Sequence, residues 1–268
     1  MQKRGNKIIF TFLIAMLFCC FYAMPVLAED SVYNLANIPL IELDKKHISD
    51  TFSKQVQAMS DQELNRFLVD LMNKEPDKRI LQEKLAKIGI EAVIKDVQPA
   101  AKTASMEDTD LNLEIGAYLR HGDTYWRLIA TYDVNNLESI PASYDTLGIY
   151  WDSSKASYWS YDTDGYSTLR DSTQYNNGLL LFNVHDKDFN TWTYYYDAVY
   201  IVPNTTGWID FGVKYTHTYG LVQKTYNVTS GITFSFPGIV TGSINYSVTT
   251  QYQEAKWERS DTNAFYRS

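Results

Sequence analysis

The sequence predicts a mainly β protein, an antiparallel β-sandwich or jelly-roll-like domain preceded by a small helical segment. From residue 111 onward, apolar and polar residues alternate with period two, which is typical of strands with one face in a core. Turn sequences such as Asn176-Asn177-Gly178 separate these runs. Between residues 60 and 90 the apolar spacing is helical instead, and all six tryptophans lie outside that stretch. The 268 residues are 45% hydrophobic, which is enough to fold around a core.

Residues 1–28 have the pattern of a secretory signal peptide. Three basic residues, Lys3, Arg4 and Lys7, precede an uncharged apolar run that ends in small residues at Ala28. Signal peptidases cut after such a run, so cleavage is expected after Ala28. The alternative is an uncleaved membrane anchor, because the run is about long enough to span a bilayer.

Export changes the composition of the chain. Both cysteines, Cys19 and Cys20, lie in the signal, so the mature chain is expected to have no disulfide and no thiolate metal site. The formal net charge of the whole chain is -8, and loss of the basic start makes it more acidic. An acidic chain has the wrong sign for binding phosphates, which argues against nucleic acid as a partner. We therefore expect a secreted or extracellular protein, of a kind commoner in Gram-positive bacteria.

Residues 29–95 are predicted to form the helical segment. Ser60-Asp61-Gln62-Glu63 is a capping box, in which the serine hydroxyl and the glutamate carboxylate accept from free amides at a helix start. A second helix is expected from about Pro76 to Gly89, whose left-handed conformation ends it. Residues 96–110 are predicted to be a linker. If the chain is processed there, residues 29–95 are a candidate pro-region.

Residues 111–268 are predicted to form the β domain. The first strand begins at Leu111, and the turn Arg120-His121-Gly122-Asp123 leads to a second strand that begins at Trp126. Further strands are expected where alternating runs recur, at 147–151, 157–161, 179–185, 192–202, 208–221, 225–236 and 239–253.

Aromatic residues of this domain form the first candidate site. Neighbouring aromatic residues place rings on both faces of a strand, because successive side chains alternate. One set is expected in the core and the other on the surface, where flat rings with polar tips bind sugars, peptides or lipid head groups. The candidate ligand-binding residues are Tyr150, Trp159, Trp192, Tyr194 and Tyr196. The alternative is that tyrosine is simply a good strand former.

A calcium loop at Asp186, Asp188 and Asn190 is the second candidate site. These residues and Asp197 have the spacing at which a tight loop offers several hard oxygens to calcium. Thr191 stands where such loops carry glycine. The alternative is an acidic turn whose aspartates cap their own backbone. Calcium is the one cofactor that the sequence suggests.

Catalytic motifs are absent from the sequence. None of the four histidines lies in a His-Glu-x-x-His motif, and no Gly-x-Ser-x-Gly motif occurs. His217, in the middle of a predicted strand, is expected to be a packed or exposed residue without a role. These observations favour a protein that is not an enzyme.

Residues 225–253 contain no Asp, Glu, Lys, Arg or His. Small polar residues alternate with apolar ones, and Pro237-Gly238 divides the stretch into the two arms of an amphipathic hairpin. The pattern resembles the Ser/Thr-rich stem of aerolysin-type β-pore-forming toxins, and this resemblance implies a hairpin that enters a membrane. The apolar candidates for its membrane face are Ile232, Phe234, Phe236, Ile244 and Tyr246. The alternative is an ordinary hairpin on the face of the sandwich.

Three hypotheses for the function follow. The leading one is a secreted, non-enzymatic β-sandwich module that binds a glycan, a peptide or a membrane outside the cell or at its surface. The second is a secreted β-pore-forming or antimicrobial protein with residues 225–253 as its membrane stem, and only this one requires an oligomer. The third is a sandwich-fold hydrolase with paired aspartates from different strands.

Overall fold

The computed structural model of the protein describes residues 43–44, 48–95, 106–139, 141, 144–220, 229–235, 241–247 and 254–268. The predicted signal peptide and most of the predicted linker lie outside these residues. The backbone divides into two compact units, and all described residues belong to the second, Leu40–Ser268. Among them, no helix is long and apolar enough to cross a membrane.

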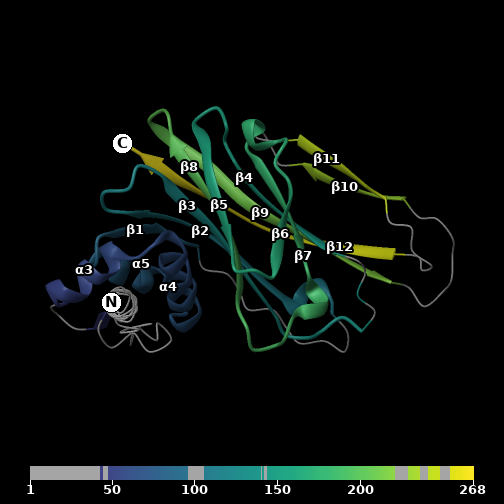
Figure 1. The fold of residues 1–268 in the computed structure, drawn as a ribbon, viewed down its shortest axis with the longest axis horizontal. Helices are drawn as coiled ribbons and strands as arrows, with labels where there is room; N and C mark the ends of the chain where they lie inside the picture. The colour runs from purple at the N-terminus through teal and green to yellow at the C-terminus, as the bar shows by residue number, and fades with distance from the viewer. Residues whose placement is uncertain are drawn as a thin grey trace, which may run out of the picture. The chain divides into compact units, whose positions relative to one another are not determined.

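Two five-stranded antiparallel sheets form the body of this unit (Figure 1). The first sheet has the order β1-β2-β3-β8-β5, with β1 (Ile90–Val93), β2 (Leu111–Arg120), β3 (Trp126–Val134), β8 (Tyr195–Pro203) and β5 (Ala156–Thr163). The second has the order β12-β9-β4-β7-β6, with β12 (Glu254–Arg267), β9 (Gly207–Gly220), β4 (Asp145–Trp151), β7 (Leu179–Val184) and β6 (Ser167–Asp171). The predicted class, a mainly β antiparallel sandwich with a small helical segment before it, is confirmed.

The hydrophobic core lies between the two sheets. β2 and β3 contribute Leu113, Ile115 and Leu128 from the first sheet, and β4 and β9 contribute Leu147 and Phe211 from the second. The inward residues are two positions apart along each strand, which explains the alternation in the sequence. Burial of one such side chain stabilises the fold by roughly 1.5–3 kcal/mol.

The predicted hairpin forms a two-stranded sheet of its own. β10 (Thr229–Ser235) pairs antiparallel with β11 (Thr241–Ser247), and the register places Ile232 opposite Ile244. The same register places Phe234 opposite Gly242 and Tyr246 opposite Ser230, so the residues of the predicted apolar face pair with one another. Phe236 and the predicted turn lie outside the described residues.

In the described part of the chain, the helices α3 (Asp50–Ala58), α4 (Asp61–Lys74) and α5 (Lys78–Ala86) precede the sheets. The predicted capping box is confirmed at the start of α4, where the Glu63 N–H donates to Ser60 Oγ and the Ser60 N–H donates to Glu63 Oε2. α5 begins close to the predicted position, with the Asp77 side chain accepting from the Ile80 N–H at 3.0 Å.

Residues 90–93 differ from the prediction that the whole of 29–95 is helical. They form β1, which pairs with β2 so that Ile90 lies opposite Arg120. Gly89, at a φ of 77°, turns the chain out of the helical part, as predicted. The apolar run behind it is too short for another helix, and the edge of β2 satisfies its backbone N–H and C=O groups.

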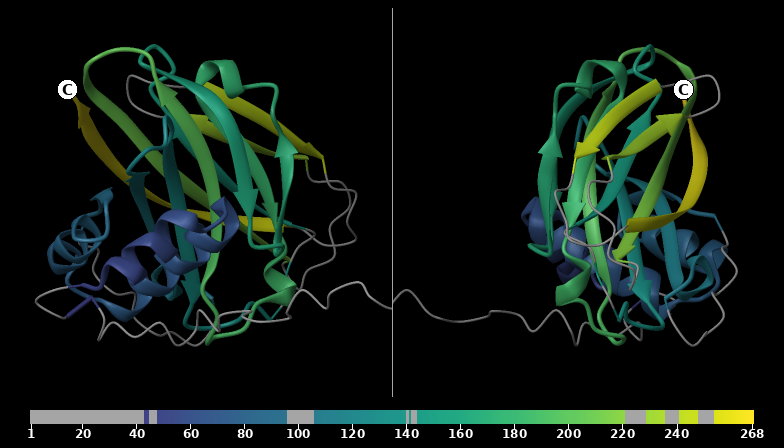
Figure 2. Two further views of the ribbon diagram at one scale, coloured as in Figure 1. Left: turned by 60° about the vertical axis from the view of Figure 1, so that its left-hand side comes forward. Right: turned by 90° about the vertical axis from the view of Figure 1, so that its right-hand side faces the viewer.

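The helices lie on the first sheet, beside β2 and β3 (Figures 1 and 2). The Tyr118 hydroxyl on β2 donates to Met72 Sδ on α4, and Asn65 Nδ2 on α4 donates to the Tyr200 hydroxyl on β8 at 2.8 Å. Asn65 and Tyr118 are fully buried. The helical segment therefore covers side chains of the first sheet that would otherwise face solvent.

A buried arginine joins α4 to the first sheet. Arg127 on β3 is fully buried, and its two terminal nitrogens donate to Asp123 and to Asp61 at the start of α4. The guanidinium carbon also lies 4.8 Å from the centroid of the Tyr125 ring. Burial would raise the pKa of Asp61, but hydrogen bonds from Tyr125 and Arg127 outweigh it and lower that pKa.

Replacing Arg127 by alanine should destabilise the protein by about 3 kcal/mol, because two carboxylates then lose their buried cation. Urea unfolding followed by circular dichroism measures this change. Arg79→Ala is the matched control, since Arg79 is exposed and lies 3.9 Å from Asp77, and it should cost less than about 1 kcal/mol. An Arg127→Ala variant as stable as this control would show that the guanidinium does not hold α4 on the sheet.

Candidate functional site

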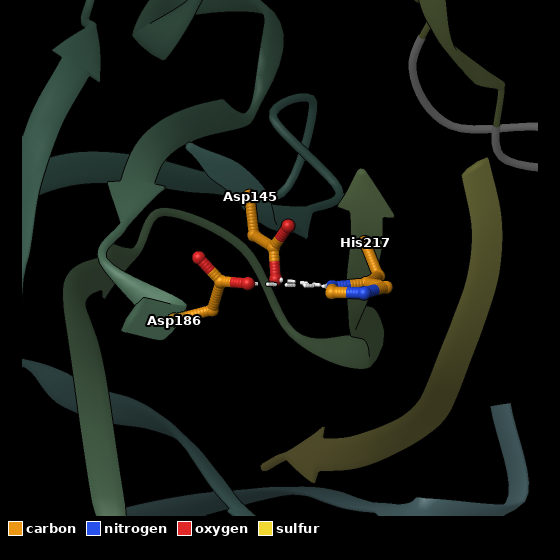
Figure 3. A group of neighbouring side chains, drawn as sticks. All are labelled: Asp145, Asp186 and His217. Atoms are coloured by element: carbon orange, nitrogen blue, oxygen red, sulfur yellow. Dashed lines mark hydrogen bonds and ion pairs between the residues drawn. The ribbon is translucent and has the colours of Figure 1, made fainter. Parts of the chain in front are cut away.

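One part of the sandwich interior holds a group of ionisable side chains: Asp145, Asp186, His217 and Glu138, which we call the His217 cluster. Figure 3 shows the carboxylates of Asp145 and Asp186 and the imidazole of His217 facing one another. Asp145 and His217 are fully buried, and Asp186 is 7% exposed. A group of charged residues this deeply buried is uncommon unless its members are paired or hold an ion.

Strand pairing brings the cluster together. Asp145 begins β4, and the residue after it pairs with the residue before His217 in β9. Asp145 itself pairs with Val184 of β7, and Asp186 follows two residues later at the start of the short helix η4 (Asp186–Asp188). Glu138 lies between β3 and β4. Segments far apart in the sequence therefore supply the four side chains.

Both nitrogens of the His217 ring face carboxylates. Nδ1 is 2.8 Å from Asp145 Oδ2 and 3.9 Å from Asp186 Oδ2. Nε2, on the other side of the ring, is 3.4 Å from Glu138 Oε2. Three carboxylates thus surround one imidazole.

The Asp145 carboxylate is held from several directions. The Tyr215 hydroxyl donates to its Oδ2, and the Thr218 N–H donates to its Oδ1 at 2.8 Å. By contrast, Asp186 Oδ2 is buried and makes no hydrogen bond with any part of the chain that the structure describes. The cluster therefore contains one fixed carboxylate and one with an unsatisfied oxygen.

The electrostatics of the cluster reflect this excess of negative groups. Burial raises the pKa of Asp186 to about 7, with the neighbouring charge of Asp145 as the second cause. Burial would lower the pKa of His217, but the charge and hydrogen bond of Asp145 outweigh it and raise that pKa. An additional positive charge would relieve the repulsion between the two aspartates.

Only one of the three predicted calcium ligands belongs to this cluster. Asp186 points into it, whereas Asp188 is exposed at the end of η4. Asn190 Oδ1 accepts from the Trp192 N–H at 3.1 Å and so caps its own loop. Sequence spacing therefore groups Asp186 with its neighbours in the chain, whereas the structure places it beside Asp145 and His217.

The predicted aromatic surface is divided between core and solvent. Tyr150 and Tyr196 are each 2% exposed, so these two residues are corrected to buried positions within the sheets. Trp159 is 63% exposed, Trp192 is 81% exposed, and Tyr194 is about half exposed. Alternation correctly indicates two sets of rings, but Tyr150 and Tyr196 lie in central strands, whereas Trp159 lies on the edge strand β5 and Trp192 and Tyr194 lie in the loop before β8.

Trp159 lies on the edge strand β5. The pairing of β5 with β8 shifts register between Tyr158 and Ser160, so Trp159 is the extra residue of a β-bulge. Its ring stacks on Tyr125, with centroids 6.5 Å apart and an angle of 17° between the planes. The bulge and this stacking together give an exposed indole a fixed position.

Known proteins offer little guidance to the site. No family model matches the chain, and no curated protein matches its sequence. Among solved structures the chain is similar to the seventh ScaB type I cohesin from Pseudobacteroides cellulosolvens, with a TM-score of 0.26 and 9% identity. The similarity covers 35% of this chain and 69% of the cohesin. At these values it identifies no family and carries no argument about function.

Asp197 on β8 is a further buried carboxylate, separate from the His217 cluster. Its oxygens accept from the hydroxyls of Tyr132 and Ser167. Complete burial raises its pKa to about 7, against these hydrogen bonds, and the charge of Asp164 adds to the rise. In the unfolded chain its pKa is about 3.9.

This difference predicts a pH dependence of stability. Between about pH 4 and pH 7 the folded state holds the Asp197 proton and the unfolded state does not, so stability falls as pH rises, by up to about 4 kcal/mol. Above about pH 7 the folded state also loses the Asp197 proton, so stability does not fall further from this group. Asp197→Asn should make this decline smaller in urea unfolding measured from pH 5 to pH 8, with the part due to Asp186 remaining, whereas Asp188→Asn, at an exposed position, should leave the decline unchanged. A decline of equal size in wild type and Asp197→Asn would contradict the assignment.

Proposed function

We propose that the protein is an exported, non-enzymatic β-sandwich module that binds a neutral glycan outside the cell or at its surface. The signal-like residues 1–28 support export. The sandwich supports a module in which a rigid sheet framework presents the binding residues.

The exposure of large aromatic side chains carries this proposal. Three of the six tryptophans are more than half exposed: Trp159, Trp192 and Trp208, the last of which is 60% exposed. Exposed indoles cost hydration free energy, and when they are also held in place they are typical of binding surfaces. Trp159 is the best placed, because its ring already rests on Tyr125.

A neutral glycan fits the chemistry of this surface. Sugar rings present flat faces of C–H groups that pack on an indole, and their hydroxyls find polar partners around it. The net charge of -8 disfavours an anionic polymer at long range. The ligand is therefore expected to contact Trp159 by stacking and not by ion pairing.

Replacing Trp159 by alanine should weaken binding to a neutral cell-wall polysaccharide by about 30-fold, because a central aromatic contact contributes about 2 kcal/mol. A glycan array identifies the ligand, and pull-down on the insoluble polymer measures the loss. Trp208→Ala is the matched control, since this tryptophan is equally exposed on the second sheet, and it should bind as wild type does. Failure to bind any glycan contradicts the proposal, and loss with Trp208→Ala alone contradicts the choice of Trp159.

A second candidate function is membrane pore formation by the 225–253 hairpin. The observation that favours it is that, among the residues the structure describes, β10 and β11 pair with each other and with neither five-stranded sheet. Each has seven residues within the structure, whereas a membrane β-strand needs about 9–11, so a stem would have to extend into the neighbouring uncharged residues. Such a stem would act only in an oligomer.

Release of dye from lipid vesicles tests this second function. Ile232→Lys should abolish release, because lysine on the lipid-facing side costs about 2–4 kcal/mol at mid-membrane. Thr233→Lys, at the next residue and on the opposite face of the strand, should release dye as wild type does. The assay uses the full mature chain and a form cleaved near Lys102. Absence of release from both forms excludes the pore.

A further inference from the structure

The unsatisfied oxygen of Asp186 is the strongest unexplained feature of the His217 cluster. Asp186 follows β7 in the chain and is more than nine-tenths buried. Its Oδ2 points toward His217 Nδ1, which lies 3.9 Å away (Figure 3). A buried carboxylate oxygen without a hydrogen bond costs about 1–3 kcal/mol or more. Something that binds between the two aspartates and the imidazole would remove this cost.

The atoms around this point have the spacing of metal ligands. One oxygen of Asp145, one of Asp186 and one nitrogen of His217 all lie within 4.8 Å of one another. A divalent ion bonded to oxygen or imidazole nitrogen at about 2.0–2.2 Å holds neighbouring ligand atoms roughly 3–4 Å apart. The Nδ1 distances of 2.8 and 3.9 Å are on this scale, so small side-chain movements complete the site.

We propose that Asp145, Asp186 and His217 bind a divalent transition-metal ion, of the class of zinc, between β4, β9 and η4. The ion takes the place of the hydrogen that His217 Nδ1 shares with Asp145 Oδ2. Its positive charge offsets the two neighbouring carboxylates, and it bonds to the oxygen of Asp186 that is otherwise unsatisfied.

Glu138, Tyr215 and Thr218 lie where groups that hydrogen-bond to metal ligands are expected. When Nδ1 binds the metal, the ring proton is on Nε2. The Nε2–H then donates a hydrogen bond to Glu138 Oε2, which lies 3.4 Å away. A carboxylate behind a metal-bound histidine fixes the ring and raises its basicity. Tyr215 and Thr218 orient Asp145 in the same way.

The ligand atoms determine the kind of ion. An imidazole nitrogen suits zinc and its neighbours, whereas calcium and magnesium prefer oxygen ligands and more of them. The mixed set of one nitrogen and two carboxylate oxygens therefore favours a transition metal over the calcium that the loop spacing suggests. Because the ligands come from three separate segments, the ion would cross-link the second sheet and raise the stability of the folded state.

Metal titration of the full mature chain tests the proposal. The protein is stripped with EDTA, dialysed, and titrated with ZnCl₂, MnCl₂ and CaCl₂ by isothermal calorimetry, and thermal unfolding is followed with each metal. We expect one zinc ion per chain, a higher unfolding temperature with zinc, and no comparable effect of calcium. No zinc binding, or a stronger response to calcium, overturns the proposal.

Three variants locate the ion. Asp186→Asn should weaken zinc binding by more than about 100-fold, while Asp188→Asn, which changes an exposed residue two positions away, should bind zinc as wild type does. Wild-type affinity in Asp186→Asn would place the ion elsewhere and overturn the proposal. Glu138→Gln provides a second readout if Asp186→Asn does not fold. It should lower affinity about 10- to 100-fold by removing the outer partner of His217, and an unchanged affinity would count against the proposal.

Discussion

The His217 cluster is organised around the carboxylate of Asp145. A carboxylate without solvent must find donors from the protein, and Asp145 takes them from Tyr215, His217 and a backbone N–H of β9. All of these lie on one neighbouring strand, so the start of β4 is held in register with the later part of β9. Asp186 in η4 and Glu138 in the β3–β4 connection approach the ring of the same His217.

The fold was largely predictable from local pattern, whereas the cluster was not. Period-two alternation indicates strands because burial of one face repeats at every second residue, and the Ser60 capping box marks the start of α4 through contacts within four residues. His217 and Asp145 are 72 residues apart, and nothing near either one in the sequence indicates the other. Alternation predicts a surface position for Tyr150 and Tyr196, because it separates two faces without showing whether the second face is buried.

The helical segment differs in composition from the β domain but packs closely against it. Residues 48–95 contain none of the tryptophans, yet Asp61 and Asn65 of α4 bond to Arg127 and Tyr200 of the first sheet and to Tyr125 just before β3. Polar contacts of this kind require exact placement, because a buried arginine or asparagine with a missing partner is costly. The amphipathic face found in the sequence indicates that α4 must pack against something, but only these contacts identify the first sheet as its partner.

β1 gives the helical segment a structural role beyond covering a face. It is the outermost strand of the first sheet, and its backbone pairs with the last part of β2, residues 117–120. A sheet edge without such a strand is a template for pairing with other chains. A recombinant fragment cut at the change in composition would begin with an open edge at β2 and would be prone to strand exchange and aggregation. Residues 90–93 therefore protect the edge of β2 from pairing with other chains. They do so although they lie in the part of the sequence that is predicted to be helical.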